Sequence, residues 1–157
     1  MKGLKNGQGI KKTPAQSFVE FALVLPILLV LIISAIELGR LFYTKIVITN
    51  AAREGAYYLV THITDKDATD ATLKEGTEDA AKAEAANSGI PVIEGFPDIT
   101  VEFSPETGWV PGDNIEVTVN TTVDNLLIIG FLGNILSITA TNNSFDLSSS
   151  VEMMVQP

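Results

Sequence analysis

The chain has 157 residues, which is enough for one small domain or for one domain with an anchor. Its formal net charge is −9, and every acid lies at Glu20 or beyond, so the strongly acidic body argues against nucleic acid as a partner. The sequence contains no cysteine, which excludes disulfides, thiolate metal sites and a cysteine nucleophile.

The first segment, residues 1–15, is a basic leader. It contains Lys2, Lys5, Lys11 and Lys12 and no acid. A basic tail before an apolar run also has the shape of a secretory signal peptide, but this run is longer than the usual apolar region of about 7–15 residues. No small-x-small cleavage site in a loop follows it. By the positive-inside rule we expect a cytosolic N-terminus and an exported acidic body.

A membrane-spanning helix is predicted over residues 16–38. From Phe21 to Ile36 every residue is apolar except Ser34. This run is shorter than the roughly 20 residues that cross a bilayer core, and counting from Phe18 reaches that length only by including Glu20. Pro26 removes one backbone hydrogen bond, which a membrane helix tolerates, and it predicts a kink or a local loosening.

The helical pattern continues to about Thr61 and leads into an exported domain over residues 39–157. Apolar residues recur at spacings near three and four, and we expect this face to cover a sheet: Leu38, Leu41, Phe42, Ile46, Ile48, Ala52, Ala56, Leu59 and Val60. A second helix, capped at Thr64 or Asp65, is expected to run to about Asn87. Its thin apolar face predicts a surface position against the sheet or the long helix.

After Pro91 the hydrophobic period changes to two, which predicts a half-buried antiparallel sheet. The four alternating segments are Ile99–Phe103, Ile115–Val123, Leu136–Ala140 and Phe145–Val155. The apolar segment Leu126–Ile138 is either a buried connection or a patch that touches the membrane surface or a neighbouring subunit. The predicted fold is α+β: a long N-terminal membrane-spanning helix that continues into a small domain with a second helix and a roughly four-stranded antiparallel sheet.

No residue pattern indicates catalysis, a metal or a cofactor, and we expect a protein that is not an enzyme. His62 is the only histidine and is expected to be structural or exposed near the helix end. The acids from Asp65 do not fit an EF-hand loop, because the sixth and twelfth positions are Asp70 and Gly76 rather than Gly and Glu. Trp109 lies in a turn-rich loop, either as a binding contact or as an aromatic that holds the loop on the core.

The junction between leader and helix resembles a known processing site. Ala15 is followed by Gln16-Ser17-Phe18-Val19 and then by Glu20 and Phe21, at the head of an apolar helix. This stretch through Pro26, together with Asn50-Ala51-Ala52-Arg53-Glu54-Gly55-Ala56, resembles the TadE-like pseudopilin family of the tight-adherence (Flp) type IV pilus system. The resemblance covers Ala15 to about Tyr57.

The resemblance implies that a prepilin peptidase cuts between Ala15 and Gln16, where the family usually has Gly in place of Ala15. Glu20, next to Phe21 in the assembly segment, would then meet the new N-terminal amine of a neighbouring subunit. An ionisable residue inside a spanning helix needs such a partner. The alternative is that Glu20 lies at headgroup level, where the helix dipole favours a carboxylate.

The expected function is that of a minor pseudopilin in the inner membrane, which assembles with other pilin or pseudopilin subunits and the pilus machinery. The major pilin of this system is much shorter than this chain, which favours a minor, initiating or tip-associated subunit. An alternative is a membrane-anchored extracytoplasmic binding or adhesin domain with an uncleaved signal anchor. An exported enzyme is a third reading, which the missing catalytic constellation disfavours.

Overall fold

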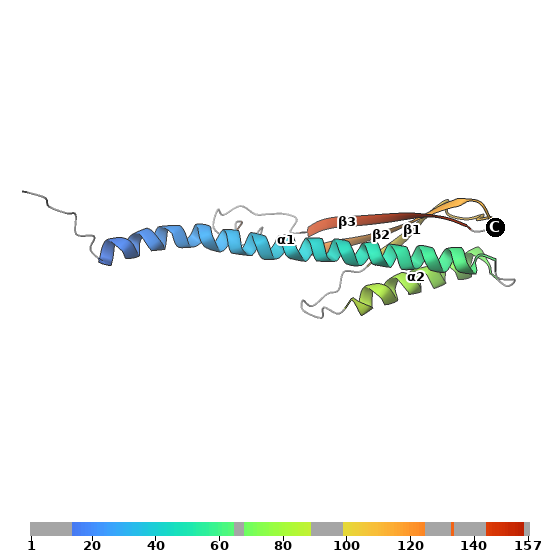
Figure 1. Ribbon diagram of the computed structural model, residues 1–157, viewed down its shortest axis with the longest axis horizontal. Coiled ribbons are helices and arrows are strands. Elements are labelled where there is room, and N and C mark those ends of the chain that lie inside the picture. The colour runs from blue at the N-terminus through green and yellow to red at the C-terminus, as the bar shows by residue number, and fades with distance from the viewer. Residues whose placement is uncertain (1–13, 65–67, 89–98, 125–132, 134–143, 156–157) are drawn as a thin grey trace, which may run out of the picture.

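A computed structural model describes residues 14–64, 68–88, 99–124, 133 and 144–155 of the chain (Figure 1). The elements are α1 (Pro14–His62), α2 (Asp70–Asn87), β1 (Ile99–Ser104), β2 (Asn114–Asp124) and β3 (Ser144–Met154). The predicted α+β class is confirmed: a long apolar N-terminal helix is followed by a second helix and an antiparallel sheet.

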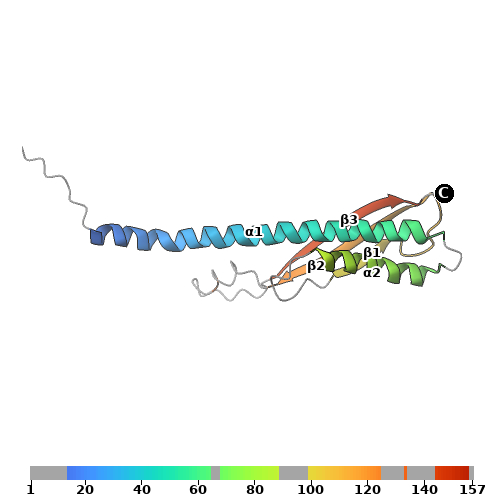
Figure 2. The same ribbon diagram turned by 60° about the horizontal axis from the view of Figure 1, so that its bottom comes forward.

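The long helix α1 has two halves with different surroundings. Its 49 residues span about 74 Å at about 1.5 Å per residue. The N-terminal half extends beyond all other described elements, and the C-terminal half runs beside the sheet and α2 (Figures 1 and 2). The first buried side chain along α1 is that of Glu37, so packing against the domain begins where the apolar run ends.

Helix α2 begins later than the sequence suggested. Its N-cap is Thr69, whose hydroxyl accepts from the backbone N–H of Thr72, while the Thr72 hydroxyl accepts from the backbone N–H of Thr69. This reciprocal capping box satisfies two otherwise free donors, so the expected cap at Thr64 or Asp65 was wrong. The predicted end at Asn87 is correct.

Small residues form the seam between α1 and α2. On α2 the buried side chains are Leu73, Thr77, Ala81 and Ala85. A Cβ added to Gly55 of α1 would lie 3.2 Å from Cγ2 of Thr77 and 3.3 Å from its backbone oxygen. The two helices therefore approach closely because Gly and Ala leave room for the backbone. The surface position predicted for α2 is confirmed.

The sheet has three strands in the order β1-β2-β3, and both pairs are antiparallel. Because β2 pairs directly with β3 along its whole length, from Asn114↔Met154 to Asp124↔Ser144, no strand lies between them. Among the described residues, the sheet has one strand fewer than the expected count of about four. The expected strand Leu136–Ala140, and the apolar segment Leu126–Ile138 apart from its residue 133, lie outside the described residues.

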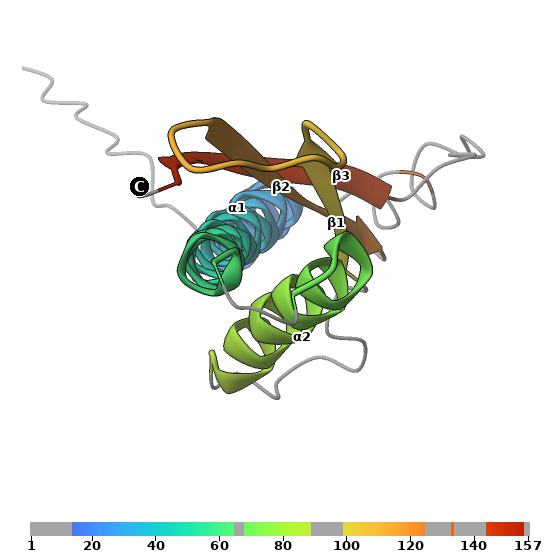
Figure 3. The ribbon, with the colours of Figure 1, turned by 90° about the vertical axis from the view of Figure 1, so that its right-hand side faces the viewer.

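One face of the sheet lies against the two helices, as Figure 3 shows along the axis of α1. Alternate residues of β2 are buried on this face: Ile115, Val117, Val119, Thr121 and Val123. Of these, Ile115, Val117 and Val119 pack in clusters with buried residues of α1 that include Ile48, Ala52, Ala56 and Leu59. The expectation that α1 covers the sheet is confirmed. Leu38, Phe42 and Ile46 were expected on the same face but are exposed.

Two aromatic contacts stabilise the end of the domain that lies far from the N-terminal half of α1. The Trp109 side chain is 7% exposed, its Nε1 donates to the backbone oxygen of Pro105 at 2.6 Å, and its ring lies 5.8 Å from that of Phe103. Trp109 thus holds its loop on the core. The His62 ring stacks on Tyr58 with centroids 4.0 Å apart, at the last turn of α1, which is the structural role expected for it.

Candidate functional site

The candidate site is the bare N-terminal half of α1. Every side chain from Ala15 to Leu29 is exposed, and these include large apolar residues such as Phe18, at 74%, and Leu23, at 71%. An apolar surface of this extent is rare on soluble monomers, because each exposed side chain of this size forfeits about 1.5–3 kcal/mol of burial. By length and composition this helix can cross a membrane, and lipid or other helices would bury its apolar side chains.

Glu20 is the only charged residue within this bare stretch. Nε2 of Gln16 lies 3.4 Å from Oε1 of Glu20, one turn away, which is at the long limit for a hydrogen bond. In the described part of the chain the one ion pair joins Lys82 and Glu78, so Glu20 has no cationic partner there. The carboxylate of Glu20 therefore retains acceptor capacity for a group from another molecule.

The other residues singled out in the sequence lie on the same helix. Ala15 and Gln16 stand in the first turn of α1, and Phe21 is 60% exposed beside Glu20. Pro26 lies inside α1, which is one continuous helix through that position. The kink expected at Pro26 and the cleavage expected after Ala15 stay predictions.

The point where α1 joins the domain carries a second carboxylate. Glu37 is only 4% exposed, and its Oε2 has no hydrogen-bond partner. One turn later, Nη2 of Arg40 donates to the backbone oxygen of Asp124 at 3.0 Å, at the end of β2. Sequence reasoning did not single out Glu37 as buried, although its place directly after the apolar run was a signal that it does not face water.

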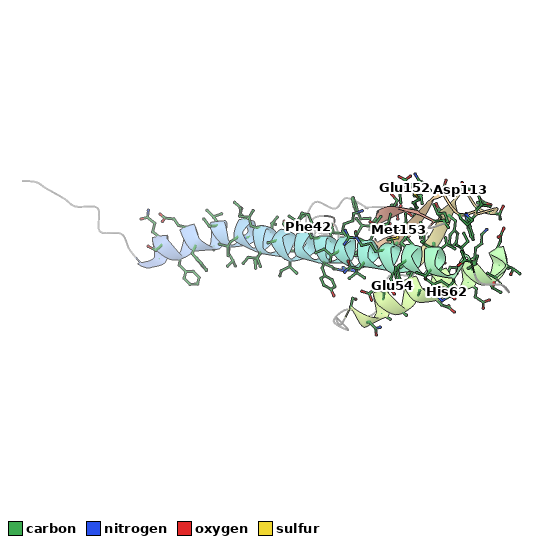
Figure 4. The ribbon with its side chains drawn as sticks, turned by 45° about the vertical axis from the view of Figure 1, so that its right-hand side comes forward. Phe42, Glu54, His62, Asp113, Glu152 and Met153 are labelled. Atoms are coloured by element: carbon green, nitrogen blue, oxygen red, sulfur yellow. The ribbon has the colours of Figure 1, made fainter. Side chains whose placement is uncertain are left out.

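An apolar stripe continues from the bare half of α1 along the exposed side of the domain. Leu38, Phe42, Ile46 and Tyr57 are 53–62% exposed, and Arg53 lies between them on the same side. Figure 4 shows Phe42 before the sheet begins and Glu54 further along the helix. The exposed apolar surface of α1 therefore extends beyond the N-terminal half of the helix.

The comparison with protein families bears on this helix. The model described as TadE-like protein matches residues 15–56. This segment is TadE-like. The family resemblance seen in the sequence is thus confirmed, and it supports a role associated with the tight-adherence pilus. Neither the curated proteins nor the solved structures contain a match to the chain.

The TadE-like segment includes both the bare half of α1 and the start of the packed half. In its last part, Asn50–Ala56, the small residues Ala51, Ala52, Gly55 and Ala56 are all buried, while Arg53 and Glu54 are exposed. The small residues are needed because α2 and the sheet approach α1 here, at Thr77, Ala81 and Val119. This part of the TadE-like pattern is thus a packing seam rather than a chemical site.

Within the described residues, no group of three or more His, Asp or Glu side chains is placed to hold a metal ion. What the exposed N-terminal half of the TadE-like helix offers chemically is an apolar surface with one carboxylate, Glu20, near its N-terminal end. Such an arrangement suits association with lipid and with other helices.

Proposed function

We propose that this chain is a minor pseudopilin that takes part in assembling a tight-adherence type IV pilus through subunit packing. The observation that carries the proposal is the N-terminal part of the TadE-like helix, Ala15 to Leu29, in which every side chain is exposed and Glu20 is the only charged residue. An isolated anchor needs no carboxylate in its apolar run, whereas subunits that must find one another gain a specific contact from it. The proposed role is non-catalytic.

The proposed site works in two steps. A prepilin peptidase removes residues 1–15 on the cytosolic side of the inner membrane, which creates an α-amino group on Gln16. Glu20 of a neighbouring subunit then accepts from that amine, because a carboxylate and an ammonium in a low-dielectric setting attract strongly. The basic leader before the helix and the acidic body after it support an orientation with a cytosolic N-terminus and an exported domain.

Beyond the membrane, the exposed stripe with Phe42, Ile46 and Tyr57 extends the packing surface of α1 along the domain. Its apolar side chains favour burial against another helix over exposure to water. The sheet and α2 cover the opposite side of α1, so neighbours are expected to pack on this stripe.

The deciding experiment determines the mature N-terminus. The full chain is co-expressed with a prepilin peptidase, purified from membranes and analysed by intact-mass and N-terminal peptide mass spectrometry. A chain that begins at Gln16 supports the proposal. Retention of Met1 or Lys2 contradicts it and favours the alternative, a binding or adhesin domain on an uncleaved anchor.

Matched variants at Ala15 show whether the peptidase itself makes the cut. Ala15→Gly retains a small residue and should be cut at least as well, whereas Ala15→Leu places a bulky side chain before the bond and should remain uncut. Co-expression with a catalytically inactive peptidase is the second control. Cutting of Ala15→Leu, or cutting with the inactive enzyme, would assign the processing to another protease.

A further inference from the structure

The outer edge of β3 is a long strand edge that pairs with no other strand in the part of the chain that the structure describes. β3 has 11 residues, and the sheet order places it at one side of the sheet, with β2 as its only described partner. An edge strand of this length presents a row of free N–H and C=O groups that can pair with another extended chain. This feature lies outside the bare helix and does not depend on the proposed pilus role.

The hydrogen bonds at the end of β3 identify which of its backbone groups face outward. The N–H of Val155 donates to the Asp113 oxygen at 2.9 Å, and the N–H of Gly112 donates to the Val155 oxygen at 2.9 Å, so Val155 faces the β2 side. Because the direction of the backbone N–H and C=O groups alternates along a strand, every second residue before Val155 also points these groups toward β2. The residues between them point their backbone N–H and C=O groups away from β2, to the outer edge of the sheet: Ser144, Asp146, Ser148, Ser150, Glu152 and Met154.

Two groups of the described residues reach this row, and only one of them bonds to its backbone: the Thr122 hydroxyl donates to the Asp146 carboxylate at 2.7 Å, and Lys45 reaches a backbone oxygen. The ammonium of Lys45, on α1, donates to the backbone oxygen of Ser148. A lysine over an edge is a common device that discourages unwanted pairing. The Lys45 contact involves Ser148 alone. The outward backbone N–H and C=O groups of Ser150 and Glu152 have no protein partner in the described part of the chain.

The charge around the edge indicates what kind of segment fits it. The sequence has no lysine or arginine after Lys82. The three strands carry five exposed acids, Glu102, Glu116, Asp124, Asp146 and Glu152. Figure 4 shows Glu152 on the side of the sheet away from α1 and Met153 on the side toward it. Glu116 and Glu152 are direct cross-strand neighbours, and such like-charge pairs are unfavourable.

A second copy of this chain fits the edge poorly. The β3 strand of another copy would place its own acidic side chains beside these acids. It has no lysine or arginine that could offset the repulsion. The Lys45–Ser148 and Thr49–Ser149 contacts show that β3 runs in the same direction as α1. Two β3 edges paired about a two-fold axis in the antiparallel sense would therefore point their α1 helices in opposite directions. Two copies anchored in one membrane cannot adopt that arrangement.

We propose that the β3 edge is a docking site for an extended, basic segment of a partner protein, which adds a strand beside β3. Its backbone pairs with the outward groups of Ser148, Ser150 and Glu152 and takes the place of the Lys45 ammonium on the Ser148 oxygen. Lysine or arginine side chains at alternate positions lie on the outer face beside Asp146 and Glu152. They supply the positive charge that this face lacks.

The test uses the full chain in detergent micelles and a short synthetic peptide of alternating Lys and Val as the probe. Amide hydrogen exchange is measured residue by residue along β3. Without peptide the outward amides of Ser150 and Glu152 should exchange fast and the amides of Val151 and Met153 slowly. With peptide the outward amides should slow by about tenfold or more, because they gain partners. A peptide of alternating Glu and Val is the charge control and should leave them fast.

Variants separate the edge from mere charge attraction. Ser150→Pro removes an outward N–H without a bond to β2, so the sheet should persist while peptide affinity falls at least about tenfold; Ser150→Ala should bind like the unaltered chain. Glu152→Gln should weaken binding more than Glu106→Gln, an exposed acid in the loop. Trp109 fluorescence verifies that each variant is folded.

Three results would overturn the proposal. The Lys-Val peptide could bind and leave the outward amides fast, which would show charge attraction without strand addition. Ser150→Pro could bind the peptide as well as Ser150→Ala does, which would also show charge attraction without strand addition. Protection of Ser150 and Glu152 that rises with protein concentration in the absence of peptide would assign the edge to a second copy of this chain.

Discussion

Nη2 of Arg40 lies 3.0 Å from the backbone oxygen of Asp124, which ties the first packed turn of α1 to the last residue of β2. On one side of this contact α1 is bare, and on the other it is covered by the sheet and α2. Glu37, one turn earlier, is buried with one unpartnered oxygen. A polar contact therefore stands at the start of the packed half of α1, ahead of its first buried apolar residues, Val47 and Ile48.

Arg40→Ala should weaken this junction. The variant loses a charged hydrogen bond to a carbonyl, and because the pair is exposed we expect a decrease of about 1 kcal/mol in the free energy of unfolding. Denaturant unfolding of the full chain in micelles, followed by the fluorescence of the single tryptophan, measures it. Arg53→Ala is the control, since Arg53 is an exposed arginine on the same helix, and no hydrogen bond or ion pair joins it to the described strands. Equal losses in both variants would show that the Asp124 contact contributes nothing.

Gly76→Ala should destabilise the domain although alanine is the better helix former. A Cβ at Gly76 would lie 2.3 Å from Cε1 of Tyr58 and 2.4 Å from its hydroxyl oxygen, and Tyr58 is held by its stack on His62. Overpacking costs about 1–3 kcal/mol, against a gain of about 1 kcal/mol in helix propensity. We therefore expect a net loss of up to about 2 kcal/mol and a lower midpoint in thermal unfolding followed by circular dichroism.

Two controls identify the cause of that loss. Gly39→Ala adds the same methyl group to α1 at a place where nothing lies within 4 Å, so it should cost no stability. In a Tyr58→Ala background the space is open, and Gly76→Ala should then be neutral or stabilising. A loss of the same size in that background would mean that the Tyr58 ring is not the obstacle.

The sequence predicted α1 well because its signals are long-range and redundant. An apolar run followed by helical spacing leaves little choice for residues 16–61, and α1 covers Pro14–His62. The buried face was predicted less well. Leu38, Phe42 and Ile46 follow the same spacing as Ile48 and Leu59, yet they face outward, because the seam is set by where small residues let α2 approach. Size complementarity between two helices is a tertiary property that periodicity does not contain.

The sequence predicted where the residues of the candidate site lie, but not which groups they contact. The motif placed Ala15, Gln16, Glu20 and Phe21 at the head of α1, where the structure has them. The group that pairs with Glu20 would come from another subunit, so a single chain does not contain it. The buried oxygen of Glu37 and the free edge of β3 were not predicted, because burial and strand order depend on how distant segments meet.

Thr69→Ala should shorten α2 from its N-terminal end. The Thr69 hydroxyl accepts from the Thr72 N–H at 3.3 Å and its own N–H donates to the Thr72 hydroxyl at 2.9 Å, so the variant loses the side-chain half of the capping box. N-cap removal costs about 1 kcal/mol. Hydrogen exchange should become faster at Leu73 and Lys74 before it changes at Ala81. Thr107→Ala, in an exposed loop, is the control, and unchanged exchange at Leu73 would show that the cap is dispensable.

Glu20→Ala should leave membrane insertion intact and impair assembly. Removing a carboxylate from an apolar helix lowers the cost of insertion, so the fraction that resists carbonate extraction should not fall. The loss of a pairing contact should reduce recovery of the chain with sheared pili, or its cross-linking to pilin subunits, by about tenfold, the factor that about 1.4 kcal/mol represents. Glu54→Ala removes an exposed acid from the same helix outside the apolar run and should assemble normally. If Glu20→Ala assembles as well as Glu54→Ala in the native host, the carboxylate has no pairing role, and its place at the head of α1 is explained by the helix dipole alone.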